Sequence, residues 1–415
     1  MAEAGTGSLP EIRVPAGWTF AGLVAGLAAG LALQTSTLSE PVLAAVEPLG
    51  SFWLKALQMT ILPLVSALIF IGVGQAVRTA SAGGMARRTL TLFAAVLIAG
   101  ALASVLLTPL LLGLFPVPPG AAAALSGGSG PQAAAIPGFA DFFAGLIPAN
   151  VLEAAAGGAI LPVVMFMALF ALAAARLPEA QRSLLNRLFE AIAGAMMVII
   201  GWVLALAPLG VFALAMGVAA KSGASLVALL GHYIAVVSLA GLAVLLGAYL
   251  LAMLAARQSP IAFARAMVPA QAVAISTQSS LASLPAMLAA CRKLGLREAS
   301  AEFVLPLAVA LLRATSPAMN LAVVIYVASI TGVELSPAAM VAGIAVSMLA
   351  MLGSPSLPGT ISFVTATGPI ALAMGVPIEP LALLVAVEML PDVVRTVGNV
   401  TMDVAVTATI DKRSE

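Results

Sequence analysis

Six polar side chains lie close together near the C-terminal end of an otherwise apolar chain. They occur in the segment 388–403 (EMLPDVVRTVGNVTMD) and are Glu388, Asp392, Arg395, Thr396, Asn399 and Asp403. On a helix with about 100° of rotation per residue they fall within about 100° of one face, over about 22 Å of rise. A charge at the bilayer centre costs about 2.5–3.5 kcal/mol even on insertion scales, so such side chains face protein, water or a ligand. The spacing predicts one polar stripe that binds a charged substrate or an ion.

The composition places this stripe in a membrane protein. Hydrophobic residues make up 62% of the 415 and charged residues only 8%, and the mean hydropathy is +1.14, values that a soluble enzyme of this length does not show. A net charge of +1 gives no indication of a nucleic-acid partner. The single cysteine, Cys291, and the single histidine, His232, exclude a disulfide framework and a metal cluster built on these residues, so we expect both to be packing residues. No cofactor and no metal centre are expected.

Apolar stretches long enough to cross a hydrocarbon core of about 30 Å occur eight times along the chain. They lie at roughly 17–36, 44–76, 89–115, 146–175, 190–219, 226–255, 299–332 and 376–410. Two further stretches, 259–293 and 336–373, have shorter apolar arms around a small polar cluster, so each arm reaches about half way across the bilayer and turns back. We predict an all-α polytopic membrane protein with eight transmembrane helices and two re-entrant helical hairpins. The alternative for the hairpins is a pair of broken loops outside the membrane.

The basic residues indicate the orientation. With the N-terminus in the cytoplasm, nearly all basic residues that flank the spans fall on the cytoplasmic side, and only Lys221 falls in an outer loop. We expect a multi-pass protein of the inner (plasma) membrane, with residues 1–16 as a cytoplasmic lead-in and both termini in the cytoplasm. Lys55 then lies near the outer interface, where its stem reaches the head groups. Two arginines, Arg313 and Arg395, remain deep in the apolar region.

The two hairpins and the spans that follow them repeat the same order. In each unit a hairpin precedes a span with one deep arginine, Arg313 in the first unit and Arg395 in the second. The first hairpin enters from the inside and the second from the outside, so the two units have opposite topology. Inverted repeats with broken elements that meet near the midplane are typical of secondary transporters. The sequence has no nucleotide-binding loop that would indicate a primary pump.

Several motifs occur in a characteristic order. They are MTILPLVSALIF at 59–70, LIPANVLEAAAGGAILPVVMFMALF at 146–170, APLGVFAL at 207–214, a serine-rich turn before Leu284-Pro285, VLPL at 304–307, LPG at 357–359 and the D-x-x-R-T-x-x-N-x-x-x-D register of the last span. From about residue 52 onward the chain thereby resembles the dicarboxylate/amino acid:cation symporters, which include the archaeal aspartate transporter and the excitatory glutamate transporters. The resemblance implies a secondary transporter, and not an enzyme, for aspartate, glutamate or a related dicarboxylate.

The resemblance implies a role for each residue of the substrate site. Arg395 matches the arginine that grips the side-chain carboxylate of the substrate, a task suited to a guanidinium because it donates two parallel hydrogen bonds. Asp392 matches the carboxylate that meets the substrate amino group, which favours aspartate or glutamate over dicarboxylates without one. Asn399 matches the amide that holds the main-chain carboxylate. The other members of the implied site are Thr396 in the same pocket, Ser279 and Ser280 at the tip of the first hairpin, Gly359 at the tip of the second, and Ser316 in the seventh span.

Simpler structural explanations exist for several of these residues. Asp392 and Arg395, three residues apart, would also form a buried ion pair without any ligand. Ser279 and Ser280 would also cap the start of a helix. Glu388 would also face the scaffold or water without taking part in binding. The sequence leaves these alternatives open.

The chain departs from the family at the cation sites. The N-M-D-G-T motif of the family falls on residues 312–316, so Leu312 and Ala314 replace the asparagine and the aspartate that coordinate sodium there. Sodium, a hard cation, needs a shell of oxygen ligands, and the stretch 92–103 of the third span offers no hydroxyl either. Asp403 and the backbone near Ser354 remain as candidate cation ligands.

Arg313 falls on the methionine position of the same motif, beside the expected ion sites. We expect its guanidinium to replace the bound cation and to compensate the buried carboxylate of Asp403. The alternative is that Arg313 extends to the interface or that the motif is shifted by a few residues. The predicted consequence is sodium-independent transport, coupled to protons through Glu388, Asp392 or Asp403, or an uncoupled carrier; the alternative is a sodium-coupled C4-dicarboxylate symporter.

The resemblance also implies a division of the chain and a mechanism of transport. A scaffold that forms a homotrimer comprises residues 17–76 and 116–219, and a transport domain that moves as an elevator comprises residues 77–115 and 220–415. The tip of the second hairpin, residues 353–360, is expected to be the mobile outer gate. A channel would show a pore ring with charges from each subunit, and a sensor would add a soluble signalling domain; the sequence favours neither.

Overall fold

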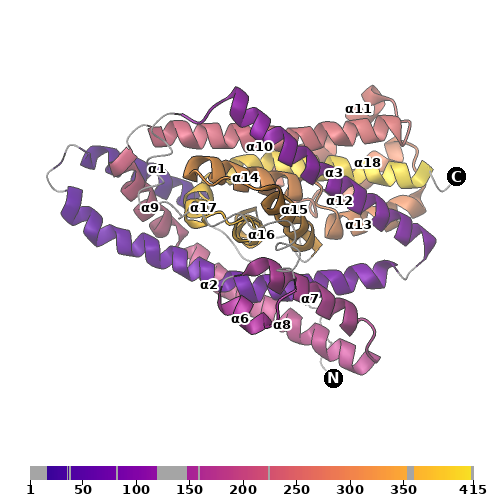
Figure 1. Cartoon of the computed structure of the whole chain (residues 1–415). Helices are drawn as coiled ribbons and strands as arrows, with labels where there is room; N and C mark the ends of the chain where they lie inside the picture. The colour runs from indigo at the N-terminus through magenta and orange to yellow at the C-terminus, as the bar shows by residue number, and fades with distance from the viewer. Residues whose placement is uncertain are drawn as a thin grey trace, which may run out of the picture.

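The computed structural model describes residues 16–34, 36, 39–80, 83–118, 147–157, 159–222, 225–352 and 359–412, and most of these residues are helical (Figure 1). The helices are α1 Ala16–Leu33, α2 Ser39–Ala80, α3 Gly84–Leu114, α6 Val151–Ala156, α7 Ile160–Ala174, α8 Glu179–Ala205, α9 Ala207–Ser222, α10 Ser225–Leu254, α11 Pro260–Thr277, α12 Leu284–Lys293, α13 Glu298–Leu311, α14 Thr315–Thr331, α15 Pro337–Leu352, α16 Gly359–Ala373, α17 Glu379–Leu384 and α18 Met389–Lys412. No strand occurs in this described part of the chain. The predicted all-α fold is confirmed.

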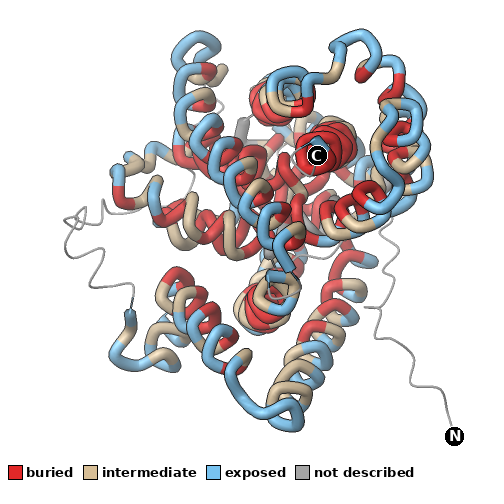
Figure 2. The backbone as a smooth tube through the Cα atoms, turned by 90° about the vertical axis from the view of Figure 1, so that its right-hand side faces the viewer, coloured by how far each residue is buried: buried red, intermediate tan, exposed pale blue. Residues whose placement is uncertain are grey.

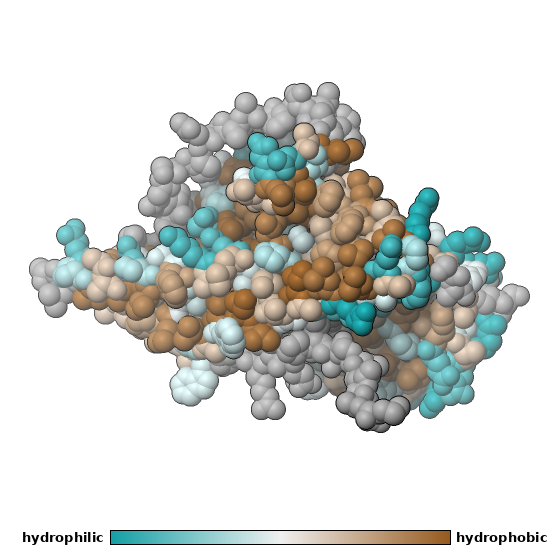
Figure 3. All heavy atoms as spheres, turned by 90° about the horizontal axis from the view of Figure 1, so that it is seen from below, coloured by the Kyte–Doolittle hydropathy of each residue, from teal (hydrophilic) through white to brown (hydrophobic). Residues whose placement is uncertain are grey.

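Five helical stretches among the described residues are long and apolar enough to cross a membrane. They are Ser39–Ala80, Gly84–Leu114, Glu179–Ala205, Ser225–Leu254 and Glu298–Thr331. Leu106 on α3 and Leu246 on α10 are 74% and 64% exposed, as side chains that contact lipid would be. In Figure 3 hydrophobic residues cover the middle of the visible face and hydrophilic residues gather at its right-hand end.

Four of the predicted spans consist of two helices in series. The spans 146–175, 190–219, 299–332 and 376–410 correspond to α6 with α7, α8 with α9, α13 with α14, and α17 with α18, and α8 begins at Glu179, before the predicted start. Proline favours such interruptions because it lacks a backbone N–H and disfavours helical geometry in the preceding residue. Pro208 follows the break between α8 and α9, and Pro317 and Pro391 lie in the first turns of α14 and α18.

The two predicted hairpins are present as pairs of helices. In the first, α11 ends at Thr277, and the residue that caps it, Gln278, has a φ of 50° in the left-handed region that often terminates a helix. In the second, α15 and α16 pack against each other. Residues 353–358, which join α15 to α16, lie outside the described residues, so the gate expected at this tip stays a prediction.

Helix α18 lies deep inside the molecule. Every residue from Gly398 to Asp411 is buried, and the tube that ends at the C-terminus is largely red in Figure 2. The helix packs against α10, α11 and α13, while α14 packs against α3, α10 and α15. These neighbours determine the partners of the polar stripe.

Glycine allows α1 to approach α9 closely. A Cβ atom at Gly22 or Gly26 would lie 2.3 or 2.5 Å from the carbonyl oxygen of Pro208 or Phe212 on α9. Small residues permit such backbone contact between helices in membranes. The spacing of four residues therefore makes one face of α1 a contact surface for α9.

Candidate binding site

The polar stripe predicted for residues 388–403 is buried inside the protein. Asp392 and Arg395 are each 3% exposed, Glu388 is 0% exposed and Asp403 is 1% exposed. Glu388 lies in the turn that joins α17 to α18, and the other residues of the stripe lie on α18. Because charges buried this deeply need partners, their hydrogen bonds define the site.

Arg395 is the centre of a buried network. Its Nη2 donates to Oε1 of Glu388 at 2.6 Å and its Nη1 donates to Oδ1 of Asn320 on α14 at 3.0 Å. Its Nε lies 3.3 Å from Oδ1 of Asp392, so the ion pair that the sequence left open as an alternative is present. The hydroxyl of Tyr233 on α10 donates to Oε2 of Glu388 at 3.1 Å. One guanidinium is thus shared between two carboxylates and connects α10, α14 and α18.

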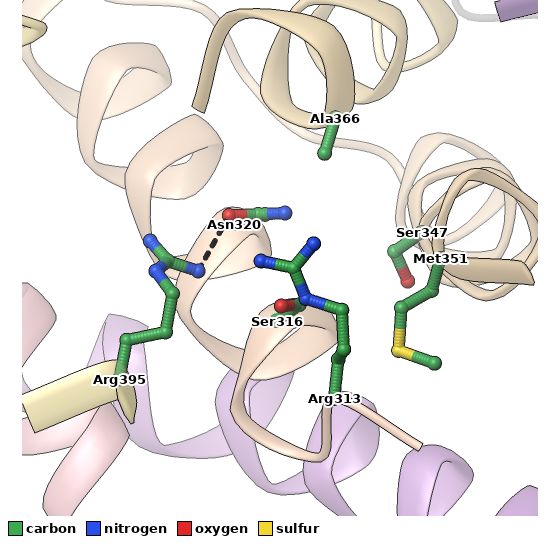
Figure 4. A pocket seen from close by; sticks show the side chains of 7 residues that line it. All are labelled: Arg313, Ser316, Asn320, Ser347, Met351, Ala366 and Arg395. Atoms are coloured by element: carbon green, nitrogen blue, oxygen red, sulfur yellow. Dashed lines mark hydrogen bonds between the residues drawn. The ribbon is translucent and has the colours of Figure 1, made fainter. Parts of the chain in front are cut away.

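A small cavity adjoins Arg395 (Figure 4). Its lining residues are Arg313, Ser316 and Asn320 from the break before α14 and from α14 itself, Ser347 and Met351 from α15, Ala366 from α16 and Arg395 from α18. The cavity volume is about 10 Å³, which is room for about one water molecule. A cavity of this size is too small for an organic ligand.

Arg313 enters this cavity from the break between α13 and α14. Its φ of 31° lies on the left-handed side of the Ramachandran plot, where a residue with a side chain is strained by about 1–3 kcal/mol. Figure 4 shows its guanidinium directed toward the amide of Asn320. Arg313 lies within electrostatic range of both Asp392 and Arg395. Arg313, which was predicted to lie beside the ion sites, therefore faces the same cavity as Arg395.

Asp403 forms no ion pair with any described arginine or lysine. Its Oδ1 is buried and accepts no hydrogen bond from the described part of the chain. The predicted compensation of Asp403 by Arg313 is thus absent, because Arg313 extends into the cavity beside Asn320 instead. On α3, the first hydroxyl in the sequence after residue 103 is that of Ser104, and it donates to the carbonyl oxygen of Ala318 at 2.6 Å. A buried carboxylate without a partner is costly, so a bound proton or cation would stabilise Asp403.

Asn399 caps the start of α14. Its Oδ1 accepts the backbone N–H of Thr315 at 2.9 Å and the Thr315 hydroxyl at 2.8 Å, and so satisfies an N–H that has no partner within the helix. Thr396 donates its hydroxyl to the carbonyl oxygen of Asp392, one turn earlier, at 2.9 Å. Neither Asn399 nor Thr396 lines the cavity. Their contact with a substrate stays a prediction.

Replacing Asn399 with alanine should destabilise the break between α13 and α14. The substitution leaves the buried N–H and hydroxyl of Thr315 without this acceptor, at a cost of about 1–3 kcal/mol. We expect a lower midpoint of thermal unfolding in detergent, followed by intrinsic fluorescence. The control is Thr315→Val, which keeps the backbone N–H bond to Asn399 and should unfold at a higher temperature than Asn399→Ala. An Asn399→Ala protein as stable as the unmodified protein would contradict the capping role.

The serines of the first hairpin do not line the cavity. Ser279 lies in the turn between α11 and α12, where its Oγ accepts the N–H of Ala282 at 3.2 Å and its carbonyl oxygen accepts the hydroxyl of Ser283 at 2.9 Å. These bonds agree with the alternative that the serines stabilise the turn before a helix. Ser280 lies in the same turn, and Gly359 is the first residue of α16.

Tyr233 and Asn320 were not predicted from the sequence. Asn320 is the only asparagine in the span 299–332, and a lone amide in an apolar span is the signal that identifies such a residue. Tyr233 carries no comparable signal, because a tyrosine in a span often serves only for packing. His232, expected to be a packing residue, is hydrogen-bonded through Nδ1 to the hydroxyl of Tyr326 at 3.0 Å.

Comparison with known proteins identifies relatives along almost the whole chain. The family model described as the sodium:dicarboxylate symporter family matches residues 16–413. The proton/sodium-glutamate symport protein of Bacillus subtilis is 26% identical over 393 residues, which cover 92% of this chain and 88% of that protein. The C4-dicarboxylate transport protein of Anaeromyxobacter sp. is 28% identical over 363 residues, covering 86% of this chain and 81% of that protein. The proton/glutamate-aspartate symporter of Escherichia coli is 28% identical over 258 residues, covering 61% of this chain and 58% of that protein.

Proposed function

This chain belongs to the sodium:dicarboxylate symporter family, and from that premise we propose that the cavity beside Arg395 is its substrate site. The protein is a multi-pass membrane protein and a secondary transporter of acidic amino acids or dicarboxylates, and it is not an enzyme. The observation that carries the proposal is a guanidinium only 3% exposed at the wall of a cavity deep in the protein. Such a group offers charge-assisted hydrogen bonds to a carboxylate in a place where water competes little.

The substrate carboxylate binds Arg395, and Ser316 and Asn320 supply further polar contacts from α14. Both line the cavity together with Arg395. Asp392 receives the amino group when the substrate is an amino acid. Asn399 and Thr396 complete the pocket after the cavity has widened. The wall made by Ser347, Met351 and Ala366 belongs to the second hairpin, so opening this hairpin would admit the substrate.

The moving unit comprises residues 77–115 and 220–415, and residues 17–76 and 116–219 form the scaffold. All residues that line the cavity come from within 313–395, which supports movement of the site as one body inside an elevator. The scaffold forms a homotrimer in the plasma membrane, with both termini in the cytoplasm. This orientation follows the distribution of basic residues.

Protons drive uptake, and Asp403 is the group that carries them. Leu312 and Ala314 offer no side-chain oxygen at the positions where the family coordinates sodium, whereas a proton needs only one carboxylate oxygen. Glu388 and Asp392 already share the charge of Arg395, while Oδ1 of Asp403 has no hydrogen-bond partner among the described residues. Asp403 is therefore better placed than the other two carboxylates to bind and release a proton.

Uptake into proteoliposomes tests this function directly. The purified protein should accumulate radiolabelled L-glutamate, L-aspartate or succinate when the outside is more acidic than the inside, in choline buffer without sodium. An inward sodium gradient at equal pH should increase uptake little, because sodium without a binding site has no coupling free energy with the substrate. Steep dependence on sodium would overturn proton coupling, and no uptake of any acidic compound under either gradient would overturn the substrate assignment.

A further inference from the structure

Among the described residues, the cavity beside Arg395 is lined by two guanidinium groups and by no carboxylate. Arg313 and Arg395 approach it from different elements, with the amide of Asn320 between them in Figure 4. The remaining lining side chains are neutral. A ligand in this cavity therefore meets two positive charges at close range. One guanidinium can bind one carboxylate, so the two together can bind two carboxylates.

Arg313 changes the balance of charge around the cavity. Glu388 and Asp392 both lie against Arg395, at 2.6 Å and 3.3 Å, so these three side chains together carry one net negative charge when both carboxylates are ionised. Such a cluster by itself would repel a carboxylate. Arg313, within electrostatic range of Arg395 and Asp392, brings the sum to zero, and it does so from the wall of the cavity. This additional charge favours the binding of a substrate with two carboxylates.

The same arrangement weakens the attraction of Asp392 for an amino group. Asp392 is 3% exposed and lies beside Arg395, within range of Arg313 as well. A substrate ammonium that approached Asp392 would therefore also approach two guanidinium groups. Repulsion from both would offset the attraction of the single carboxylate.

We propose that Arg313 binds a carboxylate of the substrate directly, and that the pair Arg313 and Arg395 selects dicarboxylates without an amino group over acidic amino acids. The proposal rests on the assignment of this cavity as the substrate site. It reverses the preference that Asp392 alone predicts. It also gives Arg313 a role in substrate recognition in place of the pairing with Asp403.

Succinate and L-aspartate form the probe pair, because they differ only by the amino group. The affinity of the purified protein for each is measured by isothermal titration calorimetry in choline buffer. The unmodified protein should bind succinate more tightly than L-aspartate. Arg313→Met should weaken succinate binding by more than about tenfold, the loss expected for one charge-assisted contact, and should weaken L-aspartate binding less, so the ratio of the two affinities falls.

Two further variants keep the result interpretable. Arg313→Lys retains the positive charge and should retain the preference for succinate with a lower affinity, because an ammonium lacks the planar donor pair. Arg265→Met, at an exposed position on α11 away from the cavity, should leave both affinities unchanged. Thermal unfolding of each variant shows whether it is folded.

Three outcomes decide between the assignments. Tighter binding of L-aspartate than succinate by the unmodified protein overturns the proposal, as does a folded Arg313→Met protein in which both affinities change by the same factor. If Arg313→Met is unfolded, the Arg313→Lys protein decides, and loss of its preference for succinate overturns the proposal. Binding of neither compound by the unmodified protein overturns the substrate site itself.

Discussion

Replacing Arg395 with methionine should lower the affinity for acidic substrates by more than about 100-fold. The substitution removes the guanidinium that binds the substrate carboxylate, and it leaves Glu388 and Asp392 buried without their shared partner. Breaking a buried ion pair by removing one partner costs about 3–5 kcal/mol, so the site also becomes more repulsive to an anion. Calorimetric titration with L-glutamate, L-aspartate and succinate measures the loss.

The unpaired carboxylates in Arg395→Met would also distort the site. A double variant separates this distortion from the loss of the guanidinium that binds the substrate. Glu388→Gln combined with Arg395→Met removes one buried charge of each sign, and the amide still accepts a hydrogen bond from Tyr233. The double variant should regain thermal stability relative to Arg395→Met while its affinity for acidic substrates stays as low. Affinity close to that of the unmodified protein in either variant would show that Arg395 is not the carboxylate-binding group.

Replacing Asp403 with asparagine should abolish accumulation driven by a proton gradient. The amide has the size of the carboxyl group and resembles its protonated form, but it cannot release a proton. The variant should therefore bind substrate and exchange external for internal substrate, while net uptake under an inward proton gradient is lost. Loading vesicles with unlabelled substrate measures exchange, and an imposed pH difference across empty vesicles measures accumulation.

Asp411 provides a matched control on the same helix. It pairs with Arg297 at 2.8 Å near the end of α18, so Asp411→Asn makes the same chemical change away from the cavity. This variant should still accumulate substrate under a proton gradient, although its stability should fall by the small value of a partly exposed ion pair. Undiminished proton-driven accumulation by Asp403→Asn would assign the coupling proton to another group.

Local properties of the sequence determined the membrane setting, the spans and both hairpins. The length of an apolar stretch, and a polar interruption between two short apolar arms, can be read from neighbouring residues along the chain. The same holds for the basic residues that flank each span. The stripe from Glu388 to Asp403 was also predictable, because its register is set by one helix. The breaks within the spans were not predicted, since proline in the first turn of a helix is compatible with a continuous apolar pattern.

The contacts of the buried charges with other helices were decided by the tertiary structure alone. Arg395 bonds Asn320, 75 residues away, and Tyr233 bonds Glu388, 155 residues away, and no pattern within one span records how two helices are rotated against each other. Arg313 was predicted as a deep arginine, but the direction of its side chain depends on its own left-handed backbone conformation in the break between α13 and α14. That backbone turn directs Arg313 into the cavity with Arg395, so Arg313 does not pair with Asp403. The direction of a side chain follows the local backbone and the packing of neighbouring helices, and the hydropathy of its span does not reveal it.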